Sequence, residues 1–549
     1  MKKARKYNKL ALLVIFSTSL FVGCGSDSTG TFSSTNGDDL GSGSGVEFSN
    51  EYSSPAELGK GDLMYVNFGD SNQTTVDFTG VDQTAKFFLI AGSVSETSGT
   101  SMVFSSELAA SMEKSLDVVM SNQELNYEAS DIFSAWIRAA EFDLAENGEE
   151  ISQNIGLGKS MGLKAVGLGD PQNFRVLASL TSTSSYVTVT AQAKYIGSEI
   201  ILYVDNELTE NDLNQEEINE LGVFYDDIAQ REQALLGEAS DVDSDGKFSA
   251  LITPQINRLG EMGGGIITGY FFSADLYVRN SSNPVSNEME IVYMLAPDPD
   301  GEWGYPISKQ FALSNLLMPV FPHELQHAIS YNQHVFVNNG SPEESWLNEG
   351  MSHFIEDWAG VGLENPSRYS GFLASPSSVS LVNSGSPNLL ERGAAYLFLR
   401  YLYEQSADGA AFLARLEDTY LVGVDNLVNA FNGPSGFSEF YELMARWTIA
   451  LALTNQGITQ DSRYIYQDRV LNSETGNWEG VCLICEADDN RGTVLTGVNM
   501  TTYLGSTSAV IAASAARFFD IQDLDYVYPE MQITGTASNG NFAVLIRQE

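Results

Sequence analysis

All four histidines of the 549-residue chain lie between positions 322 and 357. His323 and His327 are spaced i and i+4, so on a helix both imidazoles share one face and can bind one metal ion. Glu324 lies between them and points toward the same site without having to be a ligand, as the general base of a zinc-activated water does. The pattern predicts the active site of a zinc metallopeptidase.

Glu349 supplies a third candidate ligand. It follows His327 by 349 − 327 = 22 positions and lies in the sequence WLNEG, on a second expected helix. Two histidines and one glutamate leave the fourth position of a tetrahedral zinc ion open, which is typical of catalytic rather than structural zinc. The alternative is a pair of helical histidines that only form hydrogen bonds at the surface, and Glu349 makes that alternative less attractive.

Two prolines, Pro319 and Pro322, come just before the first histidine. Proline breaks the interior of a helix but fits its first turn, where backbone N–H groups have no intrahelical partner. The prolines therefore predict that the metal-binding helix begins near them, and it is expected to end near Asn332. The positive end of the helix dipole would then lie close to the predicted site.

The charge of the chain is strongly acidic. Its 72 Asp and Glu outnumber 28 Lys and Arg, which gives a net charge of −44 and a pI near 4.2. Like charges repel, so nucleic acid or an anionic membrane face is excluded as a partner of the folded part. A chain of this length is also too long for a single core.

The N-terminus predicts export. Residues 1–23 combine a basic start with an apolar run, 10–22, which is too short for a transmembrane helix. The run ends in LFVGC, which resembles a bacterial lipoprotein signal although Phe21 replaces the usual leucine. The resemblance implies lipidation of Cys24 and an anchor in the bacterial envelope, at the outer membrane or cell surface. The alternative is an ordinary secretory signal.

The remaining chain predicts an α+β protein made of several units. A Gly/Ser tether spans 24–46, and the lipid on Cys24 is the only expected membrane contact. The expected units are an N-terminal β-rich module with helices (47–168), a catalytic β/α subdomain (169–365), a helical subdomain (366–460) and a C-terminal β-like module (461–549). The catalytic subdomain combines a mixed sheet with the metal-binding helix.

Particular elements are expected inside these units. Strands are predicted at 63–68, 86–90, 174–178, 185–191, 199–204, 265–273 and 288–296. Helices are predicted at 105–121, 129–146, 209–235, 390–405, 409–420 and 435–454, with a Ser/Pro-rich loop at 374–388. The helix at 129–146 is expected to bury the face formed by Ile132, Trp136, Ala139 and Phe142.

A second metal site is indicated by DVDSDGKFS. It has the spacing of a calcium loop, with the candidate ligands Asp241, Asp243, Asp245, Lys247 (through its carbonyl) and Ser249. The bidentate glutamate of an EF-hand is missing, because Ile252 occupies that position. A Ca²⁺ site would need a carboxylate from elsewhere in the chain. The alternative is an Asx-rich turn leading into a strand.

Besides Cys24, the chain has only Cys482 and Cys485. In an exported protein this pair is expected to form a small disulfide. A zinc ribbon would require a second cysteine pair, and a redox site would require a helix N-terminus after a strand.

The site motifs resemble those of the gluzincin metallopeptidases, and more closely those of the hyicolysin-type secreted bacterial peptidases. The resemblance covers about residues 170–455 and includes DVDSDGK, SNEMEIVYML, HELQHAISYN, WLNEGMSHFIEDWAG and ERGAAYLFLRYL. It implies that His323, His327 and Glu349 bind Zn²⁺. It also implies that Glu324 takes a proton from the attacking water and returns it to the leaving amine of a protein or peptide substrate. The expected enzyme is an endopeptidase.

Supporting residues are less well defined. Glu356 and Asp357 are candidate hydrogen-bond partners of the metal-binding histidines, and His353 could brace Glu349. Related aminopeptidases carry a tyrosine that stabilises the oxyanion, but the comparable stretch here, LLERG, has leucine. Candidate replacements are Tyr396, Tyr331, His334 and His353. The alternative function is a non-catalytic surface lipoprotein that uses the metal-binding fold for adhesion or binding.

Overall fold

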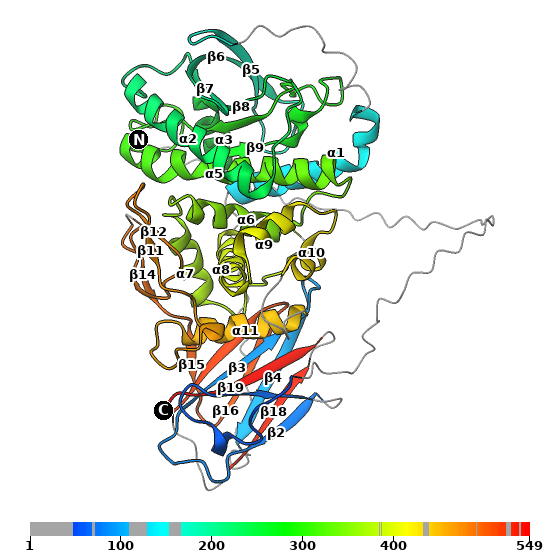
Figure 1. Ribbon diagram of the computed structural model, residues 1–549, viewed down its shortest axis with the longest axis vertical. Coiled ribbons are helices and arrows are strands. Elements are labelled where there is room, and N and C mark those ends of the chain that lie inside the picture. Colours follow the sequence, from blue (N-terminus) through cyan, green and yellow to red (C-terminus); the bar gives the residue numbers. More distant parts are fainter. Residues whose placement is uncertain are drawn as a thin grey trace, which may run out of the picture. The chain divides into compact units, whose positions relative to one another are not determined.

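The computed structural model shows a mixed α+β protein (Figure 1). It describes residues 48–68, 72–108, 129–152, 166–383, 385, 387–431, 439–489, 491–522, 529–536 and 540–549. The expected signal peptide, Cys24 and the tether lie outside these residues. None of the helices in these residues combines the length with the apolar composition that a membrane span requires.

A six-stranded mixed sheet is formed by strands between residues 171 and 294. Its order is β5 (Pro171–Leu177), β6 (Tyr186–Ile196), β7 (Ile200–Asp205), β8 (Phe248–Ile252), β10 (Ile291–Met294) and β9 (Gly269–Phe271). β7, β8 and β10 run parallel, and the other pairs are antiparallel. The strands expected in this region are present, although β9 and β10 are shorter than the expected 265–273 and 288–296, and β9 forms one edge of the sheet.

Both faces of this sheet are covered by helices, as the largely buried strands require. On one face lie α2 (Gln215–Leu236) and α5 (Met318–Tyr331), which pack side by side (Figure 1). On the other face lie α1 (Ala129–Ser152) and α3 (Pro254–Gly263). Asn214 caps α2 through a capping box with Glu217, which fixes where this helix begins.

Helix α1 corrects one sequence prediction. Phe133 and Ile137 are its buried apolar residues, whereas Ile132 is 46% exposed and Ala139 is exposed. The buried side also carries the ion pair between Arg138 and Glu141. Trp136 of the predicted face does pack against this core, beside Phe133 and Phe272, so the prediction is wrong for Ile132 and Ala139 but not for Trp136. Because the inward face also carries charged residues, the apolar pattern of the sequence does not mark all of it.

Helix α5 begins and ends close to the predicted positions, at Met318 and Tyr331. A π-helical turn, Ala312–Leu317, leads directly into it, and a second one, Asn332–Val337, follows it. Pro319 lies in the first turn of α5, but Pro322 lies inside the helix. The helix therefore begins next to Pro319, as predicted, whereas Pro322 does not lie in its first turn. The preceding π-helical turn already departs from regular α-helical hydrogen bonding, which reduces the disruption that Pro319 causes.

Six helices follow in the described residues, of which the sequence predicted the first, third, fourth and sixth. They are α6 (Ser345–Trp358), α7 (Asn365–Ala374), α8 (Leu389–Gln405), α9 (Gly409–Glu417), α10 (Gly423–Ala430) and α11 (Phe440–Leu453). α6 packs between α5 and α8, and α7 packs on α8. The apolar core extends without a break from the first sheet through these helices.

The two ends of the chain together build a β-sandwich. One sheet has the order β1 (Leu63–Val66), β19 (Asn541–Arg547), β3 (Phe87–Ser93), β17 (Ala516–Ile521) and β15 (Met500–Thr502). The other has the order β16 (Ser506–Ala512), β4 (Ser101–Leu108), β18 (Glu530–Thr536) and β2 (Gln73–Asp77). A core between them joins residues from both ends of the sequence. α11 lies against β3 and β19 (Figure 1).

This sandwich corrects the expected division of the chain. The N-terminal module (47–168) and the C-terminal module (461–549) share both sheets, because β3 pairs with β17 and β19 and β4 pairs with β16 and β18. Residues 105–108 belong to strand β4 rather than to a helix, and the rest of that expected helix lies outside the described residues. α1 packs on the first sheet, so it belongs with the candidate site.

Candidate metal centre and its cleft

Helices α5 and α6 bring the three expected ligands together. His323 Nε2 lies 3.5 Å from Glu349 Oε2, and His327 Nε2 lies 3.7 Å from Glu349 Oε1. Their ligand atoms all lie within 4.8 Å of one another, and all three side chains are buried. Residues one helical turn apart on α5 therefore face a single residue of α6, as the sequence spacing predicts.

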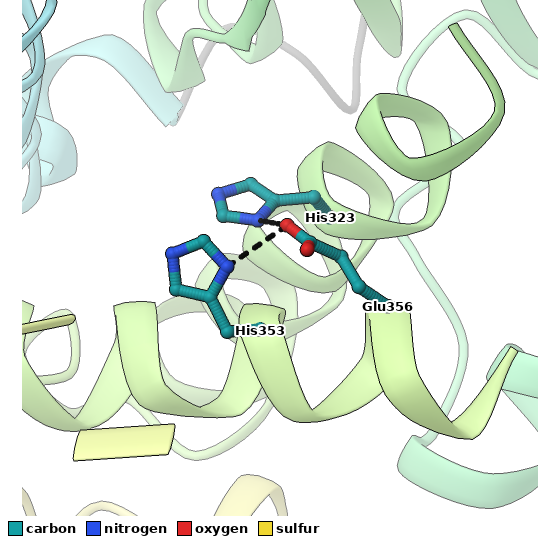
Figure 2. Close-up of side chains that lie close together, drawn as sticks. All are labelled: His323, His353 and Glu356. Atoms are coloured by element: carbon teal, nitrogen blue, oxygen red, sulfur yellow. Dashed lines mark hydrogen bonds and ion pairs between the residues drawn. The ribbon is translucent and has the colours of Figure 1, made fainter. Parts of the chain in front are cut away.

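Hydrogen bonds at the far ring nitrogens orient both histidines. His323 Nδ1 lies 2.8 Å from Glu356 Oε1, and His327 Nδ1 lies 3.1 Å from Asn348 Oδ1. Figure 2 shows that Glu356 Oε1 also accepts from Nδ1 of His353, at 2.9 Å. An acceptor at Nδ1 places a proton there and turns Nε2 toward Glu349. Burial lowers the pKa of His323, but its hydrogen bonds to Glu349 and Glu356 raise it to about 9, so a metal ion would displace the proton on Nε2.

His323, His327 and Glu349 form a donor set that fits a zinc ion. Both Nε2 atoms converge on a carboxylate, and two imidazoles with one carboxylate are a usual catalytic zinc set. Burial holds the pKa of His327 well below its usual value, which favours the neutral form that binds metals. A second group, His323, His353 and Glu356, shares His323 with the first. The three side chains of this second group are already hydrogen-bonded to one another. The group therefore orients His323 for the first group.

Positive charge stabilises the candidate ligand Glu349. Arg392 Nη1 of α8 lies 2.9 Å from Glu349 Oε2. Burial would raise the pKa of Glu349, but Arg392 and the two histidines hold it well below its usual value. The glutamate is therefore ionised, as metal binding requires.

Glu324 faces the same cleft but is held by a different element. Its Oε2 accepts a hydrogen bond, 2.8 Å long, from the backbone N–H of Phe271 in the edge strand β9. Burial raises the pKa of Glu324, which makes its carboxylate a better proton acceptor. Gly269 allows β9 to lie close to β10 and α5. A Cβ at this position would lie 2.6 Å from Tyr293 O of β10 and 3.0 Å from Val320 Cγ2 of α5.

A cleft of about 530 Å³ contains the candidate metal ligands and Glu324. Its walls come from α1, β9, α5, α6 and α8, and the lining includes Ile137, Arg138 and Arg392. Arg138 and Arg392 place N–H donors at the cleft, and sequence reasoning assigned neither of them to the site. Arg392 lies in the ERGAAYLF stretch that carries part of the family resemblance, so the sequence did contain a signal for a role of Arg392 in the site. Arg138 comes from a helix far upstream and gave no such signal.

Several residues nominated from the sequence do not line this cleft. Asp357 pairs with Arg400, 2.9 Å away, instead of with a histidine. Tyr396 stacks on Tyr369, with ring centroids 6.0 Å apart, at a separate small cavity that Asp357 also lines. The Tyr331 hydroxyl lies 2.7 Å from that of Tyr277 in the core.

His334 and His353 differ in position. His334 is fully buried beside Glu417, at 3.7 Å, away from the cleft lining. His353 does line the cleft, and burial lowers its pKa to about 4. With a proton on Nδ1 toward Glu356, neutral His353 presents a lone pair at Nε2. It can accept a hydrogen bond from a substrate but cannot donate one to an oxyanion.

The other nominated residues lie elsewhere. Cys482 and Cys485 form a disulfide near the strand β13 (Ile484–Glu486). Asp241 and Asp243 of the candidate calcium loop approach Glu290, which the sequence did not single out. The remaining three loop residues, Asp245, Lys247 and Ser249, are not in that group.

Glu356 is predicted to support metal binding. Replacing it with alanine removes the acceptor that orients His323 and His353, so zinc affinity is expected to fall about 10- to 100-fold. Competition with a chromogenic zinc chelator measures this affinity. Glu220→Ala, which removes an exposed acid on α2, is the matched control and should bind zinc like the wild type. Unchanged zinc affinity in Glu356→Ala would show that Glu356 does not position the ligand.

Comparison with known protein families found no match along the chain, and comparison with proteins of established function found none either.

Proposed function

We propose that the protein is a zinc-dependent endopeptidase with a gluzincin-type site. The observation that carries the proposal is the convergence of the Nε2 atoms of His323 and His327 on an ionised carboxylate, beside a separate buried carboxylate, Glu324, in one cleft. Three ligands with an accompanying base are the composition of a catalytic zinc site. The export signal and lipid anchor expected from the sequence belong to the same proposal.

The chain's own groups divide the work of hydrolysis. A bound zinc would polarise the substrate carbonyl and make water more acidic. Glu324 receives the proton from the attacking water and passes it to the leaving amine, aided by its raised pKa. Phe271 N–H holds one Glu324 oxygen and thereby leaves the other oriented for proton transfer.

The geometry of the edge strand suits an extended peptide. β9 pairs with β10 on one side only and closes the sheet at that edge, next to the cleft. A peptide bound along such an edge uses backbone hydrogen bonds, which are independent of side-chain identity. The aromatic and aliphatic residues of α1, including Phe133 and Ile137, offer an apolar wall for its side chains.

Metal removal tests the proposal. Purified protein is expected to contain one zinc ion at this site and to cleave casein or a peptide library. Treatment with 1,10-phenanthroline should abolish cleavage, and added zinc should restore it, because the three protein ligands alone supply no Lewis acid. A serine-protease inhibitor is the control and should leave cleavage unchanged. Cleavage that persists without metal would contradict the proposal, and zinc binding without any cleavage would favour a non-catalytic binding protein.

A further inference from the structure

A second group of carboxylates lies near the C-terminal end of α5. Two of its members belong to the loop between α2 and β8. Asp241 and Asp243 of this loop approach Glu290, the residue directly before β10. One carboxylate oxygen from each lies within 4.8 Å of the others. Two oxygens that bind one calcium ion at about 2.4 Å can be at most about 4.8 Å apart. The spacing therefore permits all three to share an ion.

Glu290 is the independent observation that points to a ligand. Its side chain belongs to a residue only 1% exposed, yet Oε2 accepts no hydrogen bond. Oε1 accepts one from the backbone N–H of Val242, which fixes the carboxyl group against the loop. A buried carboxyl oxygen without a hydrogen-bond donor is costly, and the hydroxyl of Ser240, which lies close to Glu290, forms no hydrogen bond of normal geometry with it. A cation would provide the missing partner.

Basic side chains near the loop do not fill that role. Lys247 extends away and donates to the carbonyls of Gly197 and Ser198, at 2.7 Å each. The aspartates are instead shaped by the loop backbone, whose N–H groups at Asp245 and Gly246 donate to Asp243 and Asp241.

Strand geometry excludes Ser249 from the group. Ser249 pairs with Ile291 in the parallel pair of β8 and β10, so both side chains lie on the same face of the sheet. Ile291 packs in the core on the α1 and α3 face. Glu290, one residue earlier, points to the other face. The residue that approaches the two aspartates is therefore Glu290 and not the serine at the ninth position.

We propose that Asp241, Asp243 and Glu290 bind one structural Ca²⁺ ion that fastens the starts of β8 and β10 to the α2–β8 loop. An all-oxygen set with three carboxylates suits calcium, whereas magnesium demands a more regular octahedron and retains several waters. The same loop is tied to the end of α5, because Asn332 and Gln333 side chains both donate to Glu238 O, at 2.8 Å each. The ion would stabilise the sheet that carries β9 and the cleft.

Calcium titration of the full-length protein tests this site separately from the zinc site. Protein stripped of metal and reloaded with zinc is titrated with CaCl₂, using calorimetry and thermal unfolding, with MgCl₂ in a parallel sample. The expected result is one Ca²⁺ per chain and a Tm increase of more than about 3 °C at saturation. Absence of both effects would overturn the proposal, whatever the peptidase assays show.

Glu290→Gln identifies the ligand. Glutamine keeps an acceptor for Val242 N–H and removes the negative charge, so the variant is expected to fold, and its calcium-free Tm is the baseline for its own titration. It should show no calcium-dependent rise in Tm, and Asp241→Asn combined with Asp243→Asn should abolish the binding heat. Glu238→Gln changes an exposed acid beside the loop and should respond to calcium like the wild type. Calcium binding of wild-type strength in Glu290→Gln would refute the assignment.

Discussion

Glu324→Gln is expected to lower kcat for peptide hydrolysis about 10²- to 10⁴-fold, with zinc retained and KM little changed. Glutamine has nearly the same shape and can still accept the hydrogen bond from Phe271 N–H, so the local structure is kept. It cannot take a proton at neutral pH, however. The loss would thus fall on the proton-transfer step rather than on binding of metal or substrate.

Steady-state kinetics on a fluorogenic peptide, together with zinc analysis of the same samples, measures this effect. Glu302→Gln changes an exposed acid outside the cleft and is the matched control; it should retain wild-type kcat and zinc. If Glu324→Gln cleaved at the wild-type rate, Glu324 could not be the general base. If it lost zinc as well as activity, the two effects could not be separated, and Glu324→Asp would then be compared for partial recovery of kcat with zinc bound.

Glu349→Ala is expected to remove zinc itself. Loss of a direct ligand should weaken zinc binding by more than the 10- to 100-fold typical of a residue that only orients a ligand. Activity should vanish at low zinc concentration. The change also leaves Arg392 without its partner 2.9 Å away, so some loss of stability is expected in addition.

Folding and ligand loss can be separated in this variant. Thermal unfolding is recorded for zinc-free wild type and zinc-free Glu349→Ala, which isolates the cost of the unpaired Arg392. Zinc-dependent stabilisation is then compared, because only a protein that binds zinc gains stability from it. A Glu349→Ala protein that still bound zinc with wild-type affinity would show that the third ligand is another residue.

The candidate metal ligands could be found from the sequence because their positions depend on local helix geometry. His323 and His327 share a face of α5 by spacing alone, and Glu349 was marked by the WLNEG motif on its own helix. Glu356 was nominated in the same way and does contact His323. Asp357, its neighbour on α6, points around the helix to Arg400 instead.

Contacts between distant segments could not be found in that way. Nothing in the sequence around Arg138 or Glu290 indicates that one lies at the cleft and the other at the DVDSDG loop. The sandwich is a similar case: β3 is apolar on both faces, but its partners β17 and β19 lie more than 400 residues later. Pairings of this kind are set by tertiary packing, which hydrophobic periodicity does not encode.

The most direct test of a zinc peptidase is product analysis with matched metal analysis. Wild type and Glu324→Gln, each shown to carry one zinc per chain, are incubated with the same peptide library, and the new termini are identified by mass spectrometry. The peptidase hypothesis predicts internal cleavage products with the wild type and, at equal zinc content, almost none with Glu324→Gln. Equal product yields from the two proteins, or no products from zinc-loaded wild type, would contradict it.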